Sequence, residues 1–156
     1  MTTQFVVAQE PKFKDVYKDW YVFTLKQKNA NICYISSMAT KSEGNYSKRG
    51  DVLFVVTHRP LEKEFGVVNF RTGYNFKKNT VATITINKKQ FSLFTHGSDG
   101  WAKDSDTDKA ITKAMIRGSQ MIIVGTSTRG TKTTDTFSLS GFTSAFKAAS
   151  KACKIK

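Results

Sequence analysis

The stretch TVATITINKKQFSLFT, from Thr80 to Thr95, carries the clearest strand signal in the chain. Apolar residues alternate with polar ones on both sides of a short turn at residues 87–89; they are Ala82, Ile84 and Ile86 before the turn, then Phe91 and Leu93 after it. A period of two is typical of a half-buried strand, because successive side chains point to opposite faces of a sheet. The stretch therefore predicts an antiparallel hairpin.

Similar runs lie on both sides of this hairpin. WYVFTL, NICYISS, DVLFVVTH and FGVVNFRT come before it, and two more strands follow within residues 119–141, around the turn Arg129-Gly130-Thr131-Lys132. Polar loops with Lys, Asn, Gly and Pro separate the runs. About eight such strands predict an all-β fold, an immunoglobulin-like antiparallel β-sandwich, although a closed barrel would give the same pattern.

Two segments follow a helical period instead. In residues 106–117 one stripe holds Ala110, Ile111, Ala114 and Met115, with Asp and Thr available as N-caps and Gly118 at the C-cap position. After Gly141 a second stripe holds Phe142, Ala145, Phe146, Ala149 and Cys153. We expect two short helices, the last at the C-terminus, with Cys153 turned toward the sheet.

The length of 156 residues fits one domain, which we place at residues 19–156. Residues 1–18 are interpreted as an N-terminal segment, a possible remnant of an export signal. The reason is that Val6 and Ala8 precede Gln9 with the spacing of a signal-peptidase site. An ordinary cytosolic terminus is the alternative. No run approaches the roughly 18 apolar residues that a transmembrane segment needs.

The net charge is strongly positive, with 25 Lys and Arg against 12 Asp and Glu, or +13. Such a charge predicts attraction to anionic partners that weakens with salt. The cations are spread along the chain rather than gathered in one block. A solvated surface without a specific partner would have the same composition.

Two cysteines, Cys33 and Cys153, lie near opposite ends of the chain. In an oxidising compartment a bond between them would close a loop of about 120 residues, whereas in the cytosol they would be buried thiols. Their spacing fits neither a zinc site nor a redox CxxC motif.

The tripeptide Arg49-Gly50-Asp51 matches the integrin-binding motif of adhesion ligands. The same residues suit a junction between a loop and a strand, because Gly gives backbone freedom and Asp bonds to neighbouring backbone. We prefer the junction, since a tripeptide match is weak support for adhesion.

Residues that often carry chemistry are present but do not form a known pattern. Asp104, Asp106 and Asp108 mimic the first calcium ligands of an EF-hand, but Lys109 and Met115 replace the Gly and Glu that such a loop needs, so helix capping explains the acids better. His58 and His96 end strands and accompany no nucleophile motif. No cofactor, no metal and no catalytic residue is therefore expected.

Two further patterns are compatible with ligands, but packing explains both of them better. Hydroxyl side chains follow Gly125 and surround Gly130, and they could form hydrogen bonds to a glycan or a phosphate. Thr also favours exposed strands for packing reasons alone. The hydroxyl residues are Thr126, Ser127, Thr128, Thr131, Thr133 and Thr134. Aromatic residues with a basic charge suit single-stranded nucleic acid, but the rings alternate as a core requires and no nucleic-acid motif appears.

Several stretches in the same order resemble the invasion-associated locus B family of alphaproteobacterial envelope proteins. They are DWYVFT, ICYISS, SKRGDVLFVVTHRP, GYNFKKN and the long run from Phe91 to Cys153. The resemblance implies a β-sandwich, export to the periplasm or outer envelope, and a disulfide between Cys33 and Cys153. It carries over no catalytic residue and no cofactor, and a role of some relatives in host-cell invasion need not apply here.

The sequence thus predicts a non-enzymatic exported envelope protein, periplasmic or associated with the outer membrane. Its expected partner is an anionic lipid, lipopolysaccharide or polysaccharide, or another envelope protein, and not a nucleic acid. The cations that we single out for surface binding are Arg49, Arg59, Arg129 and Lys132. The alternative is a hydrolase that acts on an envelope glycan or peptide through His58 or His96.

Overall fold

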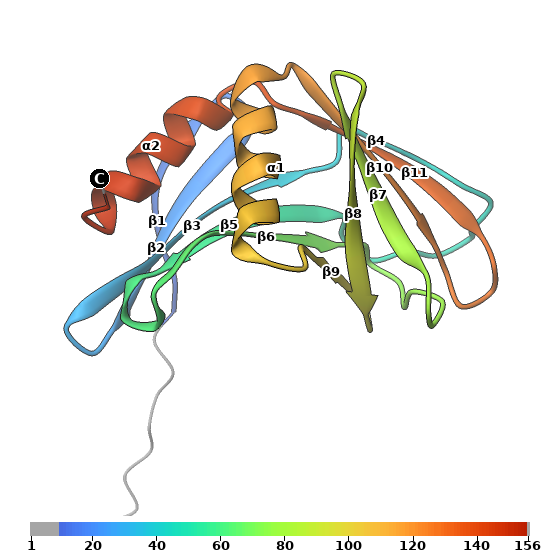
Figure 1. Cartoon of the computed structure of the whole chain (residues 1–156), viewed down its shortest axis with the longest axis horizontal. Helices are drawn as coiled ribbons and strands as arrows, with labels where there is room; N and C mark the ends of the chain where they lie inside the picture. The colour runs from blue at the N-terminus through green and yellow to red at the C-terminus, as the bar shows by residue number, and fades with distance from the viewer. Residues whose placement is uncertain (1–9, 156) are drawn as a thin grey trace, which may run out of the picture.

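Residues 10–155, which this computed structural model describes, form one antiparallel sheet with two α-helices (Figure 1). The strands are β1 (Lys12–Tyr17), β2 (Trp20–Gln27), β3 (Ala30–Met38), β4 (Lys41–Glu43), β5 (Leu53–Arg59), β6 (Glu64–Arg71), β7 (Val81–Ile86), β8 (Lys89–His96), β9 (Asp99–Trp101), β10 (Gln120–Thr126) and β11 (Lys132–Ser138). The helices are α1 (Ser105–Arg117) and α2 (Phe142–Ala152), and a 3-10 turn, η1 (Pro60–Glu62), joins β5 to β6.

The sheet is continuous but bent, so that its two halves face each other (Figure 1). The strand order is β1-β2-β3-β5-β6-β9-β8-β7-β10-β11-β4. The short strand β9 pairs with β6 on one side and β8 on the other, and so links the halves. At the far end β4 pairs with β11, although β4 directly follows β3 in the chain. The end of the sheet therefore returns close to its beginning.

Aromatic side chains fill the space between the two halves. The ring of Phe137 on β11 lies 6.0 Å from Phe54 on β5 and 6.1 Å from Phe70 on β6, both edge to face. All three side chains are fully buried. Edge-to-face contacts of this kind stabilise beyond the area that they bury, so Phe137 helps to fix how the halves pack together.

Helix α1 begins and ends as its sequence predicts. The Asp104 side chain accepts a hydrogen bond of 2.8 Å from the Thr107 N–H, which satisfies one of the free donors of the first turn. Gly118 is the C-cap. Ile111 and Met115 are buried toward the sheet.

Helix α2 covers β2 and β3 and depends on a glycine at its start. Phe142 packs edge to face on Trp20 with ring centres 5.0 Å apart. Gly141, the N-cap, has a φ of +88°, and a Cβ there would lie 1.8 Å from the Tyr17 carbonyl oxygen. Only glycine fits this close approach of backbone to backbone. Neither helix of the described residues has the length and apolarity that crossing a bilayer requires.

The predicted antiparallel β-sandwich with two helices, the last at the C-terminus, is confirmed, with a single bent sheet supplying both layers. The hairpin in residues 80–95 is confirmed as β7 and β8. Three strands were not expected: β4 and β9, which have three residues each, and β1, whose side chains are mostly exposed. Of the predicted N-terminal segment, residues 1–9 lie outside the described residues, whereas Lys12–Tyr17 pairs with β2.

Candidate functional site

The prediction that Arg49 is a surface cation is wrong. Its side chain is only 4% exposed and forms an ion pair with Asp135 on β11, which is fully buried. The pair is bidentate: the two terminal nitrogens of the guanidinium lie 2.8 and 2.6 Å from the two carboxylate oxygens. A buried carboxylate requires such a partner, because an isolated charge is costly to remove from water.

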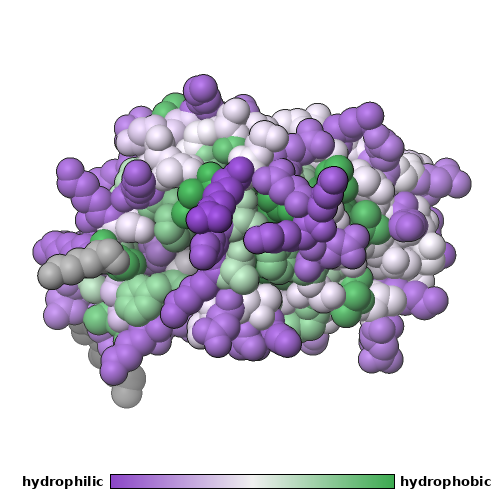
Figure 2. All heavy atoms as spheres, turned by 45° about the horizontal axis from the view of Figure 1, so that its top comes forward, coloured by the Kyte–Doolittle hydropathy of each residue, from purple (hydrophilic) through white to green (hydrophobic). Residues whose placement is uncertain are grey.

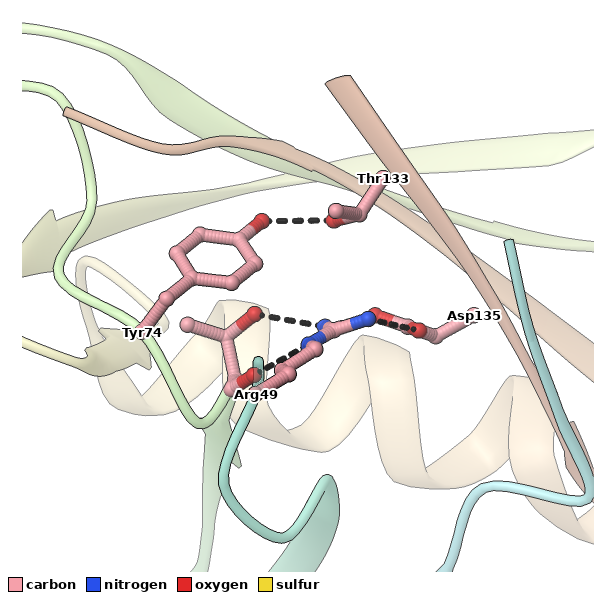
Figure 3. A network of polar contacts seen from close by, with 5 residues as sticks. Arg49, Tyr74, Thr133 and Asp135 are labelled. Carbon is pink, nitrogen blue, oxygen red and sulfur yellow. Dashed lines mark hydrogen bonds and ion pairs between the residues drawn. The ribbon is translucent and has the colours of Figure 1, made fainter. Parts of the chain in front are cut away.

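Further contacts hold the Arg49 guanidinium in one orientation (Figure 3). It donates to the Thr72 carbonyl at 2.8 Å and to the Thr72 hydroxyl at 2.9 Å. It also lies over the rings of Tyr46 and Tyr74, at 5.3 and 4.8 Å from their centres. Burial, the largest single influence, favours loss of its charge, but the hydrogen bond and charge of Asp135 together with the two tyrosines outweigh burial, and the net effect raises the pKa of Arg49.

The Arg-Gly-Asp tripeptide has the geometry of a junction. Gly50 donates a backbone hydrogen bond of 3.0 Å to the Gly73 carbonyl, and a Cβ on Gly50 would lie 3.2 Å from that oxygen. With the Arg49 side chain buried, the tripeptide does not offer the charged side chain that an adhesion motif needs. Its residues connect the loop to β5.

The other three predicted cations are not gathered in one place. Arg59 ends β5 and pairs with Glu64 at 3.2 Å and with Glu62 at 3.9 Å. Arg129 and Lys132 are exposed in the β10–β11 hairpin and form no ion pair within residues 10–155. In Figure 1 the β5–β6 turn and the β10–β11 hairpin lie on opposite sides of the molecule.

Hydrophilic side chains are also spread over the face shown in Figure 2, with apolar patches between them. In the sequence, too, the Lys and Arg residues are spread along the chain and do not form a single block.

A cleft of about 570 Å³ lies where the β4–β5 loop, the β6–β7 loop and the β10–β11 hairpin meet. We name it the tyrosine cleft. Its lining residues are Asn45, Tyr46, Ser47, Lys48, Tyr74, Ser127, Thr128, Arg129, Thr131 and Thr133. The size is within the range of small-molecule sites, about 300–1,000 Å³.

The walls of the tyrosine cleft are set by local structure. The Tyr74 hydroxyl bonds to the Thr133 hydroxyl, and the Tyr74 ring packs edge to face on Phe76. Gly125 on β10 permits this, because a Cβ there would lie 2.8 Å from the Phe76 ring and 2.9 Å from the Tyr74 hydroxyl. Four of the hydroxyl residues indicated by the sequence line the cleft: Ser127, Thr128, Thr131 and Thr133.

The histidines do not form a catalytic site in the described residues. His58 is buried, and its Nδ1 accepts a hydrogen bond from the Gly66 N–H at 2.9 Å. In the neutral ring the proton is therefore on Nε2, which faces the Ser150 hydroxyl at 3.1 Å. A general base must offer a free nitrogen to its nucleophile, so this pair is arranged for packing. His96 is exposed at the end of β8.

The acidic residues near α1 have structural partners. Asp104 is the N-cap of the helix, and Asp108 accepts a hydrogen bond of 3.0 Å from the Val68 N–H. Burial raises the pKa of Asp108. Within residues 10–155 no group of three or more His, Cys, Asp or Glu is placed to hold a metal ion.

The predicted disulfide between Cys33 and Cys153 is present, with the two Cα atoms 5.9 Å apart. Cys33 lies in the middle of β3 and Cys153 caps the end of α2. The bond fixes the final helix to the sheet across 120 residues of chain.

Sequence reasoning missed the tyrosines and Lys48 of the cleft, because they lie in loops without a periodic pattern. One signal for the buried ion pair was present. Asp135 alternates with Phe137 on the face of β11 that points inward, and with Leu139 just after the strand. An acid on a core face requires a buried cation.

Comparison with known proteins connects this structure to a family. The model of the family described as Invasion associated locus B (IalB) protein matches residues 20–150. No curated protein and no solved structure matches the chain. The matched region extends from the start of β2 to the last turns of α2, and includes Cys33, both halves of the sheet and the tyrosine cleft. Because the match covers most of the chain, this protein belongs to the invasion associated locus B family.

Proposed function

We propose that this protein is a non-enzymatic, exported protein of the bacterial envelope that binds an anionic envelope component through its basic surface. The observation that carries the proposal is the disulfide between Cys33 and Cys153 in a chain of this family. Structural disulfides form and persist in oxidising compartments such as the periplasm, and they are rare in the cytosol. The bond thus supports export and argues against a cytosolic nucleic-acid binder.

The charge of the protein supports an anionic partner. The net charge is +13, and exposed cations such as Arg129 and Lys132 have no acidic partner in the described residues. Unpaired surface cations attract anionic lipid, lipopolysaccharide or polysaccharide, and they speed association. Arg59, in contrast, is engaged by two glutamates.

The hydrolase alternative has no support from the histidines. Nε2 of His58 carries the proton in its contact with Ser150, and neither histidine bonds to a carboxylate within residues 10–155. We therefore propose a binding role without chemistry.

The test is cosedimentation with phosphatidylglycerol vesicles, phosphatidylcholine vesicles and purified envelope, at low and high salt. We expect binding to the anionic vesicles and to the envelope that weakens several-fold as salt rises, since salt screens exposed charges. The double variant Arg129→Gln with Lys132→Gln should bind more weakly, and the control Arg59→Gln should bind like the wild type. Equal binding to both vesicle types, or binding that salt does not change, would contradict the proposal.

A further inference from the structure

The tyrosine cleft has the polar lining of a sugar site rather than that of a lipid site. Five of its ten lining residues carry aliphatic hydroxyl groups: Ser47, Ser127, Thr128, Thr131 and Thr133. The hydroxyl groups of Ser47, Thr128 and Thr131 make no hydrogen bond to the described chain, and the Ser127 hydroxyl oxygen accepts only the Thr131 N–H, at 3.2 Å. Hydroxyl groups that can both donate and accept complement the hydroxyls of a sugar.

The two tyrosines give the cleft an apolar surface beside these hydroxyls. Tyr46 is 37% exposed, so part of its ring is free to contact a ligand. A sugar ring has an apolar C–H face, which packs against an aromatic ring while its hydroxyls bond at the edges. Tyrosine suits such contacts because it offers a large amphipathic surface and loses little rotamer freedom.

The cleft is also positively charged. Lys48 and Arg129 line it and form no ion pair within residues 10–155, and none of its lining residues is acidic. Arg49 does not add to this charge, because Asp135 neutralises it below the cleft. The unpaired cations favour a ligand that carries a carboxylate or a phosphate.

The buried ion pair between Arg49 and Asp135 orders one wall of the cleft before any ligand binds. The Arg49 guanidinium, held by Asp135 and Thr72, packs against the rings of Tyr46 and Tyr74. The Thr133 hydroxyl fixes the hydroxyl group of Tyr74 (Figure 3). A wall that is already ordered loses little entropy when a ligand arrives. Arg49 thus acts as a positioning residue and does not face the ligand.

From the hydroxyls, the free aromatic surface and the unpaired cations, we infer that the tyrosine cleft binds an acidic saccharide, a sugar that carries a carboxylate or a phosphate. The inference rests on the proposed function and narrows it from a diffuse anionic surface to one site. An envelope polysaccharide and a phosphorylated lipid headgroup both offer this chemistry.

The experiment titrates isotope-labelled protein with four probes and follows backbone amide shifts by NMR. The acidic probes are tetragalacturonate and glucose 6-phosphate. Their controls are the neutral methyl ester of tetragalacturonate and inorganic phosphate. We expect the acidic saccharides to shift amides of residues 45–48 and 127–133 and to bind at least about tenfold more tightly than their controls. Tighter binding of tetragalacturonate would indicate an envelope polysaccharide, and tighter binding of glucose 6-phosphate would indicate a phosphorylated lipid headgroup.

Matched variants separate the cleft from general charge. Arg129→Gln and Tyr46→Ala should each weaken binding of the tighter probe about tenfold. Lys113→Gln removes an exposed cation on α1 that does not line the cleft, and Tyr21→Ala removes a comparably exposed tyrosine on β2; both should change affinity less than twofold. Amide spectra check that each variant is folded.

Three results would overturn the inference: no shift in the cleft with either acidic probe, equal binding of the neutral ester, or equal losses for Arg129→Gln and Lys113→Gln. If the wild type still binds anionic vesicles in a salt-dependent way, such a result rejects the saccharide site and leaves the proposed function in place. If the wild type binds neither the anionic vesicles nor the envelope, the proposed function itself fails.

Discussion

Arg49 and Asp135 are 86 residues apart in the chain and form a bidentate ion pair that is buried almost completely. The pair joins the loop before β5 to β11, close to where β4 completes the sheet. It links the two halves of the fold and also supports both tyrosines of the cleft. Stability and the shape of the cleft therefore depend on the same contact.

Replacing Asp135 by Asn should destabilise the protein by about 3–5 kcal/mol, because Arg49 would keep a buried charge without its counterion. Urea denaturation at neutral pH measures the loss. Asp99→Asn is the matched control, since Asp99 pairs with Arg71 at 3.4 Å in a more exposed position and should cost at most about 1 kcal/mol. Similar losses in the two variants would show that burial of the first pair has no special weight.

Removing the disulfide by Cys153→Ser should lower the free energy of unfolding by about 2–5 kcal/mol. A cross-link over 120 residues restricts the unfolded chain, and the variant loses that restriction. Urea unfolding of the variant should match that of the reduced wild type, because both lack the same bond. Intact mass of the natively expressed protein should be lower by two hydrogens than the reduced mass. A variant as stable as the oxidised wild type would contradict this view of the bond.

Stability should fall as the pH drops from about 6.5 to about 4. Burial lowers the pKa of His58 to about 4, whereas in the unfolded chain it is near 6.5. Between these values the unfolded state binds the extra proton, so acid favours unfolding, by at most about 3 kcal/mol. The stabilisation that comes from keeping His58 neutral is fully present above pH 6.5 and is lost toward pH 4.

The difference between wild type and His58→Gln isolates this effect, because other titrating groups cancel. The free energy of unfolding of the wild type should fall more steeply with acid than that of the variant. Parallel pH profiles would mean that His58 titrates alike in the folded and unfolded chain.

Gly141→Ala should destabilise the start of α2 by more than about 3 kcal/mol. The new Cβ would overlap the Tyr17 carbonyl, and the backbone would also be strained at a φ of +88°. Gly130→Ala is the control: its φ is +82° but nothing lies within 4 Å of the Cβ position, so only the conformational cost of about 1–2 kcal/mol applies. Thermal melting by circular dichroism compares the two. Equal losses would assign the whole effect to backbone conformation.

Local patterns predicted the elements that depend on local chemistry. The alternation of Ala82, Ile84 and Ile86 defined β7, and Asp104 with Gly118 marked the ends of α1. The short strand β4 has no such pattern, because three residues cannot show a period. It forms because β11 is present to pair with it.

The cleft depends on contacts across the fold in the same way. Tyr46, Tyr74 and Arg129 come from three separate loops, and no local pattern brings them together. They meet because the fold brings the β4–β5 loop, the β6–β7 loop and the β10–β11 hairpin together at one cleft.

The sequence by itself determined the antiparallel β architecture, the two helices, the positive charge and the likeness to the family. Whether a charged residue faces water or a partner was decided only by the tertiary structure. Arg49, Arg59 and Arg129 have the same side chain, yet one is buried, one is paired at the surface and one lines the cleft. The physical reason is that the energy of a charge depends on its surroundings, and strands distant in the chain supply those surroundings.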